Sequence, residues 1–329
     1  MRDFFRRNGR RADIYCLDRD EELAGEGKPF DELPPPGPGD TTIYHFALPS
    51  PLTPAFRGLK SKRVILYHNI TPPEYFAPYD PALARLVHRG RLELRSLAGD
   101  TDFALADSEY NRRELLDMGF PRAEVFPLFV DFSKYERPHD AFVHDLFRDG
   151  RLNILFVGRV VPNKRVEDLI KVVFYYKKYI SPMVRLMVVG KTGSLPKYYH
   201  SLVRLADEFY LRPEEVQFMG HVPDEELYAL YRAADVFLSL SEHEGFCLPL
   251  LESMVFDLPV AAYGATAVPS TLGGAGVLLS DRRADRTAEL VDILARDAAL
   301  RDRVIAGQRR RIREYRGTDH GRILLELTA

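Results

Sequence analysis

Short apolar runs recur along the second half of the chain, with amphipathic stretches between them. Each run is apolar throughout, which is typical of strands in a parallel sheet that is covered on both faces. The intervening stretches place apolar residues at helical spacing. The pattern predicts a doubly wound α/β domain over residues 151–316, in which ligands bind beyond the carboxyl ends of the strands. The predicted strands are 152–158, 185–190, 216–220, 235–240, 258–263 and 275–279.

The first half repeats this pattern less regularly and predicts a second Rossmann-like α/β domain over residues 1–135, followed by a polar linker over 136–150. The chain opens with a short helical stretch, Asp3 to Asn8, that runs straight into an apolar run. A doubly wound domain normally begins with a strand and a Gly-containing turn, so we expect that this first strand is missing. The predicted strands are 12–17, 42–47, 63–68, 102–108 and 124–128.

Composition excludes several classes of protein. The 329 residues are comfortable for two domains, and 46% hydrophobic residues supply a sizeable core. A net charge of −2 gives no bulk field for nucleic acid. The two cysteines, Cys16 and Cys247, lie too far apart for a disulfide framework or a metal knuckle and favour a reducing, cytoplasmic setting. No apolar run reaches the roughly 18 residues of a membrane span, and the histidines lack ligand-type spacing, so no metal is expected.

Two carboxylates, Glu244 and Glu252, stand in the segment SEHEGFCLPLLES between a predicted strand and helix. Pro249 suits the first turn of that helix, so the loop before it offers backbone N–H groups to phosphate or hydroxyl oxygens, and Gly245 permits close approach. We expect Glu252 on the first turn, where two vicinal hydroxyls, as on a ribose, would satisfy its oxygens. The alternative is an ordinary first-turn Glu that interacts with the helix dipole.

Two cations follow the first strand of the same domain. Arg159 comes directly after Gly158, and Lys164 lies five residues later, both at the carboxyl edge of the predicted sheet. A guanidinium fork and an ammonium group suit phosphate oxygens, although an exposed basic loop is equally compatible. Neither a G-x-x-x-x-G-K-[ST] nor a G-x-G-x-x-G motif follows a strand, which disfavours ordinary triphosphatases and dinucleotide enzymes. Two cations and two carboxylates at one edge suit a nucleoside diphosphate bearing a polyol.

The elements G-R-x-x-x-x-K and E-G-F-x-L-P-x-x-E resemble those of retaining glycosyltransferases of family 4, from about residue 41 to the end of the chain. The resemblance implies the GT-B fold, with two Rossmann-like domains facing across a cleft and a last helix, 317–329, that crosses back to the first domain. It also implies that the cations hold the donor diphosphate, that the first Glu and the amides after it hold the sugar, and that the second Glu holds the ribose. Carried over, the donor site comprises Gly158, Arg159, Lys164, Glu244, Gly245, Phe246, Cys247, Leu248 and Glu252.

The first domain contributes candidates for the other substrate. His68 ends the run 63–68, and the family often has a cleft-facing His there, which makes it a catalytic candidate beside Arg159, Lys164 and Glu244; a structural His is the alternative. Ser108 is best explained as a helix N-cap. Weaker candidates for acceptor contacts are Asn69, Thr71, Glu74 and Tyr75.

A basic helical stretch at 82–99 has apolar residues at helical spacing and a cluster of cations away from them. Such a face is usually only solvated, but it could meet anionic lipid headgroups. The run 308–316 has the same two interpretations, and together they suggest a peripheral position at the inner membrane face. The cationic residues of the first stretch are Arg85, His88, Arg89, Arg91 and Arg95.

The resemblance predicts transfer of a hexose, of mannose or glucose type, from a GDP- or UDP-sugar to a glycan or lipid-linked acceptor in polysaccharide biosynthesis. The anomeric configuration would be retained by a same-face route in which the leaving phosphate accepts the proton, without metal or cofactor. A non-catalytic nucleotide-sugar-binding homologue or partner subunit, inactive because the first strand is absent, is the alternative. A nucleotide-sugar epimerase or hydrolase on the same fold is a further one.

Overall fold

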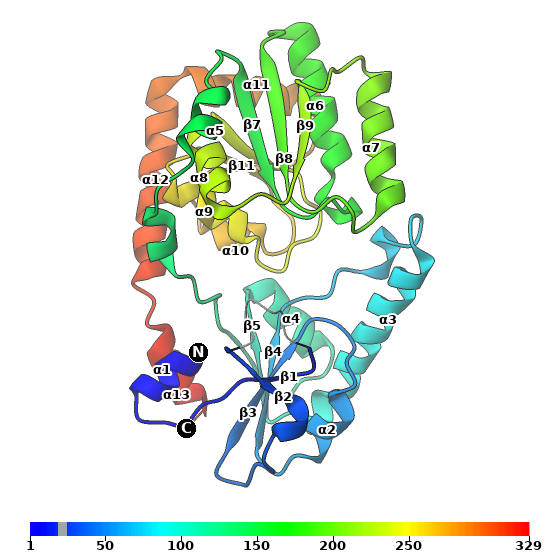
Figure 1. Ribbon diagram of the computed structural model, residues 1–329, viewed down its shortest axis with the longest axis vertical. Coiled ribbons are helices and arrows are strands. Elements are labelled where there is room, and N and C mark those ends of the chain that lie inside the picture. The colour runs from blue at the N-terminus through cyan, green and yellow to red at the C-terminus, as the bar shows by residue number, and fades with distance from the viewer. Residues whose placement is uncertain (19–24, 329) are drawn as a thin grey trace.

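The computed structural model describes residues 1–18 and 25–328 and consists of two α/β bodies stacked along its long axis (Figure 1). In the upper body a six-stranded sheet has the order β9-β8-β7-β10-β11-β12, with every neighbouring pair parallel. The chain therefore runs outward from β7 in one direction and then from β10 in the other. This is the Rossmann strand order, and its switch point lies between β7 and β10. The strands are β7 (Leu152–Val157), β8 (Val184–Val189), β9 (Val216–Gly220), β10 (Val236–Ser239), β11 (Val260–Tyr263) and β12 (Val277–Leu279).

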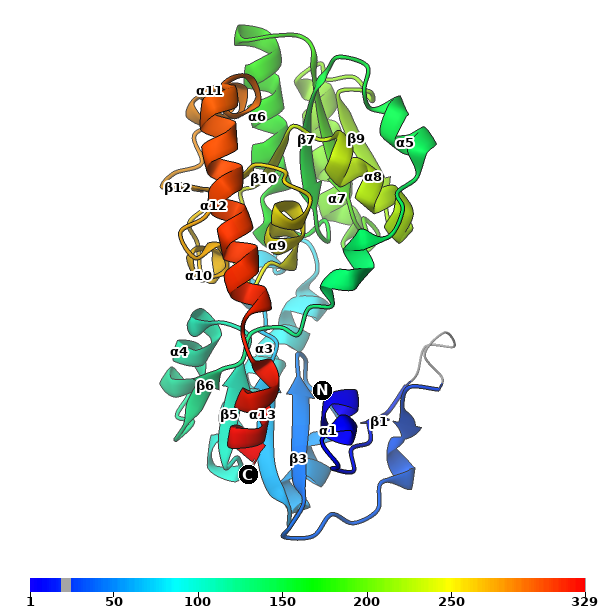
Figure 2. The same ribbon diagram turned by 90° about the vertical axis from the view of Figure 1, so that its left-hand side faces the viewer.

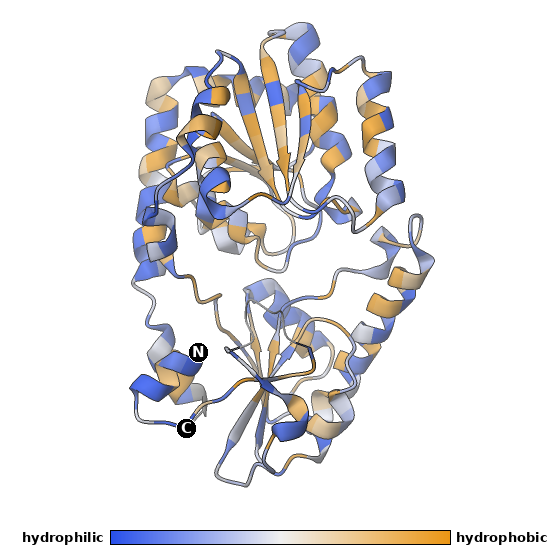
Figure 3. Ribbon diagram, in the orientation of Figure 1, coloured by the Kyte–Doolittle hydropathy of each residue, from blue (hydrophilic) through white to orange (hydrophobic). Residues whose placement is uncertain are grey.

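Helices cover both faces of this sheet, as the apolar runs predict. Along β7, Ile154 and Phe156 join the core under one group of helices, and Leu155 joins the core under the other group. Figure 3 shows the apolar strands at the centre and polar residues on the outer sides of the helices. One group is α6 (Val166–Tyr179), α7 (Pro196–Glu208) and α11 (Ala284–Arg296), and the other is α8 (Asp224–Ala233), α9 (Leu248–Val255) and α12 (Ala298–Arg316).

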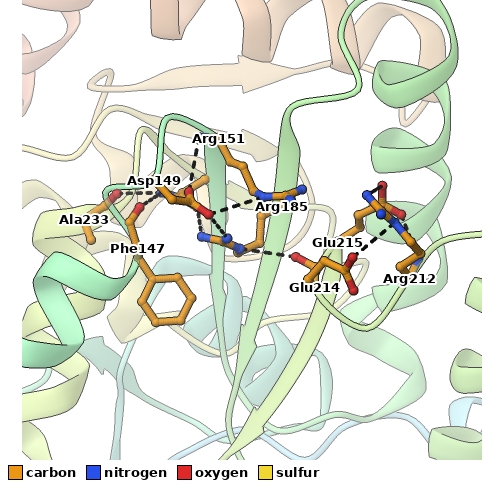
Figure 4. Close-up of polar contacts among 9 residues, drawn as sticks. Phe147, Asp149, Arg151, Arg185, Arg212, Glu214, Glu215 and Ala233 are labelled. Carbon is orange, nitrogen blue, oxygen red and sulfur yellow. Dashed lines mark hydrogen bonds and ion pairs between the residues drawn. The ribbon is translucent and has the colours of Figure 1, made fainter.

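The amino edge of the same sheet carries a cluster of charged residues (Figure 4). Arg185, the second residue of β8, is 5% exposed and contacts Asp149 at 2.5 Å and Asn153 at 3.1 Å through its two terminal nitrogens. Its Nε donates to the carbonyl of Glu214, and its guanidinium lies over the Phe147 ring. Each nitrogen of the buried guanidinium thus has a hydrogen-bond acceptor within the protein.

The lower body contains a parallel sheet of order β3-β4-β5-β6. One face packs against α3 (Pro81–Ser96) and α4 (Glu109–Asp117), and the other face packs against α1 (Arg2–Arg7) and α13 (His320–Thr328). Figure 2 shows α12 continuing from the upper body into α13 on the lower one, where Leu324 is fully buried. The carboxyl edges of both sheets face each other (Figure 1). The strands are β3 (Thr41–Phe46), β4 (Lys62–Tyr67), β5 (Phe103–Ala106) and β6 (Ala123–Val125).

The structure differs from the sequence-based expectation near the amino end. The apolar run 12–17 forms only β1 (Tyr15–Cys16), which pairs with β2 (Lys28–Pro29) in a separate two-stranded sheet. The exposed Ile14 and Leu17 show that this run does not supply core residues. Within 136–150, helix α5 (Ala141–Leu146) and the buried Phe147 pack on the upper body. The domain boundaries stay a prediction.

Candidate functional site

The candidate site lies at the switch point of the upper sheet, where β7 leads into the loop from Gly158 to Lys164. A Cβ on Gly190, which follows β8, would lie 2.1 Å from the carbonyl oxygen of Gly158, and Gly190 has φ +140°. Only glycine fits there, so the end of β8 fixes the path of the loop. The sequence interpretation missed the role of Gly190, although its place at the end of the predicted strand 185–190 was a usable signal.

Lys164 and Glu244 come together across the switch point. The Lys164 Nζ lies 2.6 Å from both carboxylate oxygens of Glu244, and Glu244 is 5% exposed. Asn163 reinforces the junction, because its Nδ2 donates to the carbonyl of His243 and its own carbonyl accepts from the N–H of Glu242. The Glu244 N–H donates to Thr266, which follows β11. One cation and one carboxylate of the predicted donor site are therefore neighbours, held by hydrogen bonds from both adjoining loops.

Other polar groups of the predicted donor site are left open. Arg159 is exposed and makes no hydrogen bond or ion pair with residues 1–18 or 25–328. Over the same ranges, no acceptor meets the backbone N–H groups of residues 245–248. These groups precede α9, in which Pro249 occupies the first turn as predicted, and Cys247 is its N-cap at φ +69°. Unpaired N–H groups at a helix start favour anions.

Glu252 is placed differently from the prediction. It lies in the second turn of α9, so it is not the first-turn acid that either sequence interpretation assumed. Its two oxygens accept from the hydroxyls of Tyr135, at 2.8 Å, and Tyr231, at 2.9 Å, while Lys134 Nζ lies 3.8 Å away. Burial, together with Glu252, raises the pKa of both tyrosines. Protein hydroxyls thus supply the hydrogen bonds that the sequence interpretation assigned to a ribose.

The loop with Glu244 packs directly on the lower body. His243 is 3% exposed, and its Nε2 lies 2.7 Å from Oδ1 of Asn69, whose Nδ2 donates to Asn111. A Cβ on Gly245 would lie 2.5 Å from the Cβ of Asn69. Burial lowers the pKa of His243 to about 4. Asn69, a predicted acceptor contact, therefore joins the two bodies in this structure.

The other predicted acceptor contacts lie on the same loop of the lower body. Thr71 is half-buried and Glu74 is exposed. The half-buried Tyr75 ends the turn η3 (Pro73–Tyr75), and its ring centroid lies 6.2 Å from that of His243. These positions adjoin the junction between the two bodies, and their role stays a prediction.

His68 lies beside this junction with both ring nitrogens engaged. Its Nδ1 is 3.0 Å from Oδ2 of Asp107, and its Nε2 is 2.9 Å from Nδ1 of His45. The sequence interpretation missed Asp107 and His45. Both lie near the carboxyl ends of predicted strands, 42–47 and 102–108. Because parallel strands end at one edge of a sheet, this position was the available signal.

The remaining candidates are resolved by their contacts. Ser108 caps α4 by accepting from the N–H of Asn111, as predicted. In α3, Arg85, His88, Arg89 and Arg95 are exposed, but Arg91 faces inward and pairs with Glu114, which corrects its place among the outer cations.

In the run 308–316, several side chains have structural partners. Gln308 is fully buried and bonds the backbone of β11 and of Leu258, and Arg309 pairs with Asp257. No helix in the described ranges is long and apolar enough to cross a bilayer.

The family comparison bears on the residues of the upper body. The description "Glycosyl transferases group 1" matches residues 140–311, just over half of the chain. The chain belongs to the glycosyl transferases group 1 family. Every predicted donor-site residue of this group 1 chain falls inside the matched range.

Curated relatives agree with this membership. A D-inositol 3-phosphate glycosyltransferase of Frankia alni is 32% identical over 232 residues, which cover 66% of this chain and 56% of that protein. An O-antigen chain mannosyltransferase B of Escherichia coli is 30% identical over 131 residues, 40% of this chain and 33% of that protein. A GDP-mannose-dependent alpha-mannosyltransferase of Mycobacterium tuberculosis is 27% identical over a stretch that covers 68% of this chain and 55% of that protein. The group 1 chain thus spans a third to just over half of their lengths.

Solved structures confirm the predicted GT-B fold of two Rossmann-like domains. The trehalose-6-phosphate synthase OtsA superposes with a TM-score of 0.68 at 17% identity, covering 87% of this chain and 71% of that one. HepE of Anabaena, solved in complex with UDP, gives a TM-score of 0.63 at 19% identity, covering 80% of this chain and 72% of that one. At these identities the likeness concerns the fold.

Proposed function

We propose that this group 1 chain is a retaining hexosyltransferase of family 4 that uses a nucleoside diphosphate sugar as donor. The observation that carries the proposal is the contrast at the switch point, where Lys164 and Glu244 are braced together while Arg159 and the N–H groups of residues 245–248 have no described partner. A ligand with a diphosphate would meet all the open groups at once.

Each group would have a defined role. Arg159, Lys164 and the start of α9 would stabilise the negative charge that develops on the departing diphosphate. Glu244 would orient hydroxyls of the sugar, and Glu252 would accept from the ribose, sharing its oxygens with the two tyrosines. With this positive charge supplied by the protein, we propose a metal-independent reaction in which the leaving phosphate oxygen accepts the proton of the acceptor.

The names of the relatives support a proposal for the donor and the acceptor. Two of them are named as mannosyltransferases, one of them GDP-mannose-dependent and one acting on O-antigen chains, and HepE was solved with UDP. We therefore propose a hexose of mannose or glucose type on GDP or UDP, and a glycan or lipid-linked acceptor of polysaccharide synthesis. The exposed cations of α3 would face the membrane that holds a lipid-linked acceptor.

Calorimetric titration with GDP-mannose and UDP-glucose tests the proposal. Arg159→Ala should weaken binding of the accepted donor about tenfold or more, since a charge-assisted hydrogen bond contributes roughly 1.5–3 kcal/mol. Arg212→Ala, an exposed arginine at the opposite sheet edge, is the matched control and should bind normally. Unchanged affinity in Arg159→Ala would refute the donor site. Tight binding by the wild type with no transfer to any glycan would instead indicate the non-catalytic homologue.

A further inference from the structure

Three side chains from successive strands of the lower sheet form a hydrogen-bonded row. His45 lies in β3, His68 directly follows β4, and Asp107 directly follows β5. The row runs from Asp107 Oδ2 to His68 Nδ1 at 3.0 Å, and from His68 Nε2 to His45 Nδ1 at 2.9 Å. Because parallel strands end at one edge, this row stands on the edge that faces the upper body.

The buried end of the row fixes the direction of its hydrogen bonds. Asp107 is 5% exposed, and in the described ranges its Oδ1 has no partner. The carboxylate therefore makes its hydrogen bond to His68 through Oδ2. A carboxylate accepts, so His68 Nδ1 carries the proton and donates. The Nε2 of a neutral His68 is then an acceptor, and His45 Nδ1 must donate to it. His45 is left with an unprotonated Nε2, which meets no described partner.

We propose that His45, rather than His68, meets the substrate in this chain and that its Nε2 accepts a hydrogen bond from a hydroxyl of the sugar held between the two bodies. His68 cannot do so in this arrangement, because both of its ring nitrogens are engaged. His68 and Asp107 are positioning residues that set the tautomer of His45. This inference rests on the proposed function, since it names a further contact of the same donor site.

Position and charge support this assignment. The backbone carbonyl oxygen of His68, the middle residue of the row, lies 3.3 Å from the place of a Cβ on Gly245, so the row stands beside the loop that carries Glu244. His45 itself is exposed at its strand end and thus open to a ligand. Partial desolvation of the ring, with His68 beside it, lowers the pKa of His45, which favours the neutral form that an acceptor must have.

Nitrogen NMR of ¹⁵N-histidine-labelled protein tests the direction of the row without any turnover. In the wild type we expect protonated Nδ1 and bare Nε2 on both His45 and His68. Asp107→Asn replaces a carboxylate that can only accept by an amide that can accept or donate, so the direction of the row is no longer fixed and both histidines should show a mixture of tautomers. The exposed His200 serves as an internal reference whose signals stay unchanged. A protonated Nε2 on His45 in the wild type would overturn the proposal.

Binding and kinetics test the contact itself. The donor that titration identifies should shift the Nε2 resonance of His45, and binding without that shift would contradict the contact. His45→Phe and Asp107→Asn should each lower kcat/KM about tenfold, the worth of one hydrogen bond, while affinity for GDP or UDP alone is kept. His45→Gln, which retains an acceptor, should recover part of the loss. His200→Gln is the control variant and should keep the kcat/KM of the wild type. If neither sugar nucleotide binds the wild type, the proposed function fails, whereas a changed tautomer population in Asp107→Asn with unchanged kcat/KM defeats only the role of His45.

Discussion

The two edges of the upper sheet both carry clustered charges, yet they are organised differently. At the amino edge every nitrogen of Arg185 that can donate has a protein acceptor (Figure 4). The fully buried Glu215 pairs with Lys177 and Arg212. At the carboxyl edge Lys164 and Glu244 are paired in the same way, but Arg159 is exposed and has no described partner. Charge density alone therefore does not distinguish the two edges.

The difference lies in what is left unpaired. A buried cation with all its hydrogen bonds made inside the protein has no capacity left for a ligand. The carboxyl edge keeps a guanidinium and a row of backbone N–H groups open, directly at the strand-order switch point. We infer that the amino edge holds the sheet together and that the carboxyl edge binds the ligand.

Removing Arg185 should have the largest effect on stability. Arg185→Ala leaves Asn153 Oδ1 and the carbonyl of Glu214 without their donor and exposes the Phe147 ring. We expect the free energy of unfolding in urea to fall by about 3 kcal/mol. Arg212→Ala, with a side chain 59% exposed, should cost less than about 1 kcal/mol. Equal losses in the two variants would show that the burial of Arg185 does not matter.

His243 should make the carboxyl edge sensitive to acid. Its pKa of about 4 in the folded protein lies below the ordinary 6.5, so the unfolded chain binds more protons between these values. Stability is therefore full above about pH 6.5 and falls as the pH approaches 4, by up to about 3 kcal/mol. His243→Gln can still donate to Asn69 but does not titrate. Urea unfolding of both proteins from pH 7 to pH 4 should show the wild type losing stability relative to the variant; parallel profiles would contradict this.

The sequence predicts the parts of this molecule that depend on local pattern. Continuous apolar runs locate all six strands of the upper sheet, and the position of Pro249 locates the start of α9. The partners of Glu252 could not be predicted, because Tyr135 reaches it from 117 positions away along the chain. The row through His45 and Asp107 likewise exists only once three strands align. Contacts between distant segments depend on tertiary geometry, which periodicity does not contain.

The two tyrosine hydroxyls that donate to Glu252 should have a smaller effect on the free energy of unfolding. Tyr135→Phe removes the hydroxyl that donates to Glu252 Oε1, while Lys134 remains 3.8 Å from the same oxygen. We expect a loss of about 1 kcal/mol in the free energy of unfolding. Tyr231→Phe is the matched variant and should cost more, because Tyr231 is 1% exposed and donates to Oε2, whereas Lys134 approaches the other oxygen, Oε1. The reverse order of the two losses would show that the cation near Tyr135 does not compensate for its hydroxyl.

Arg159 should show the smallest effect on stability, which is the sharpest test of the comparison. A side chain with no described partner gives up nothing when it is removed, so Arg159→Ala should change the free energy of unfolding by less than about 0.5 kcal/mol. Arg185→Ala, in the same sheet, provides the contrast. The wild type should then gain stability on adding the accepted sugar nucleotide, because a ligand that binds only the folded state stabilises it, and Arg159→Ala should gain less. If Arg159→Ala destabilised the ligand-free protein as much as Arg185→Ala, both edges would be structural, and the argument that places a diphosphate at the carboxyl edge would lose its basis.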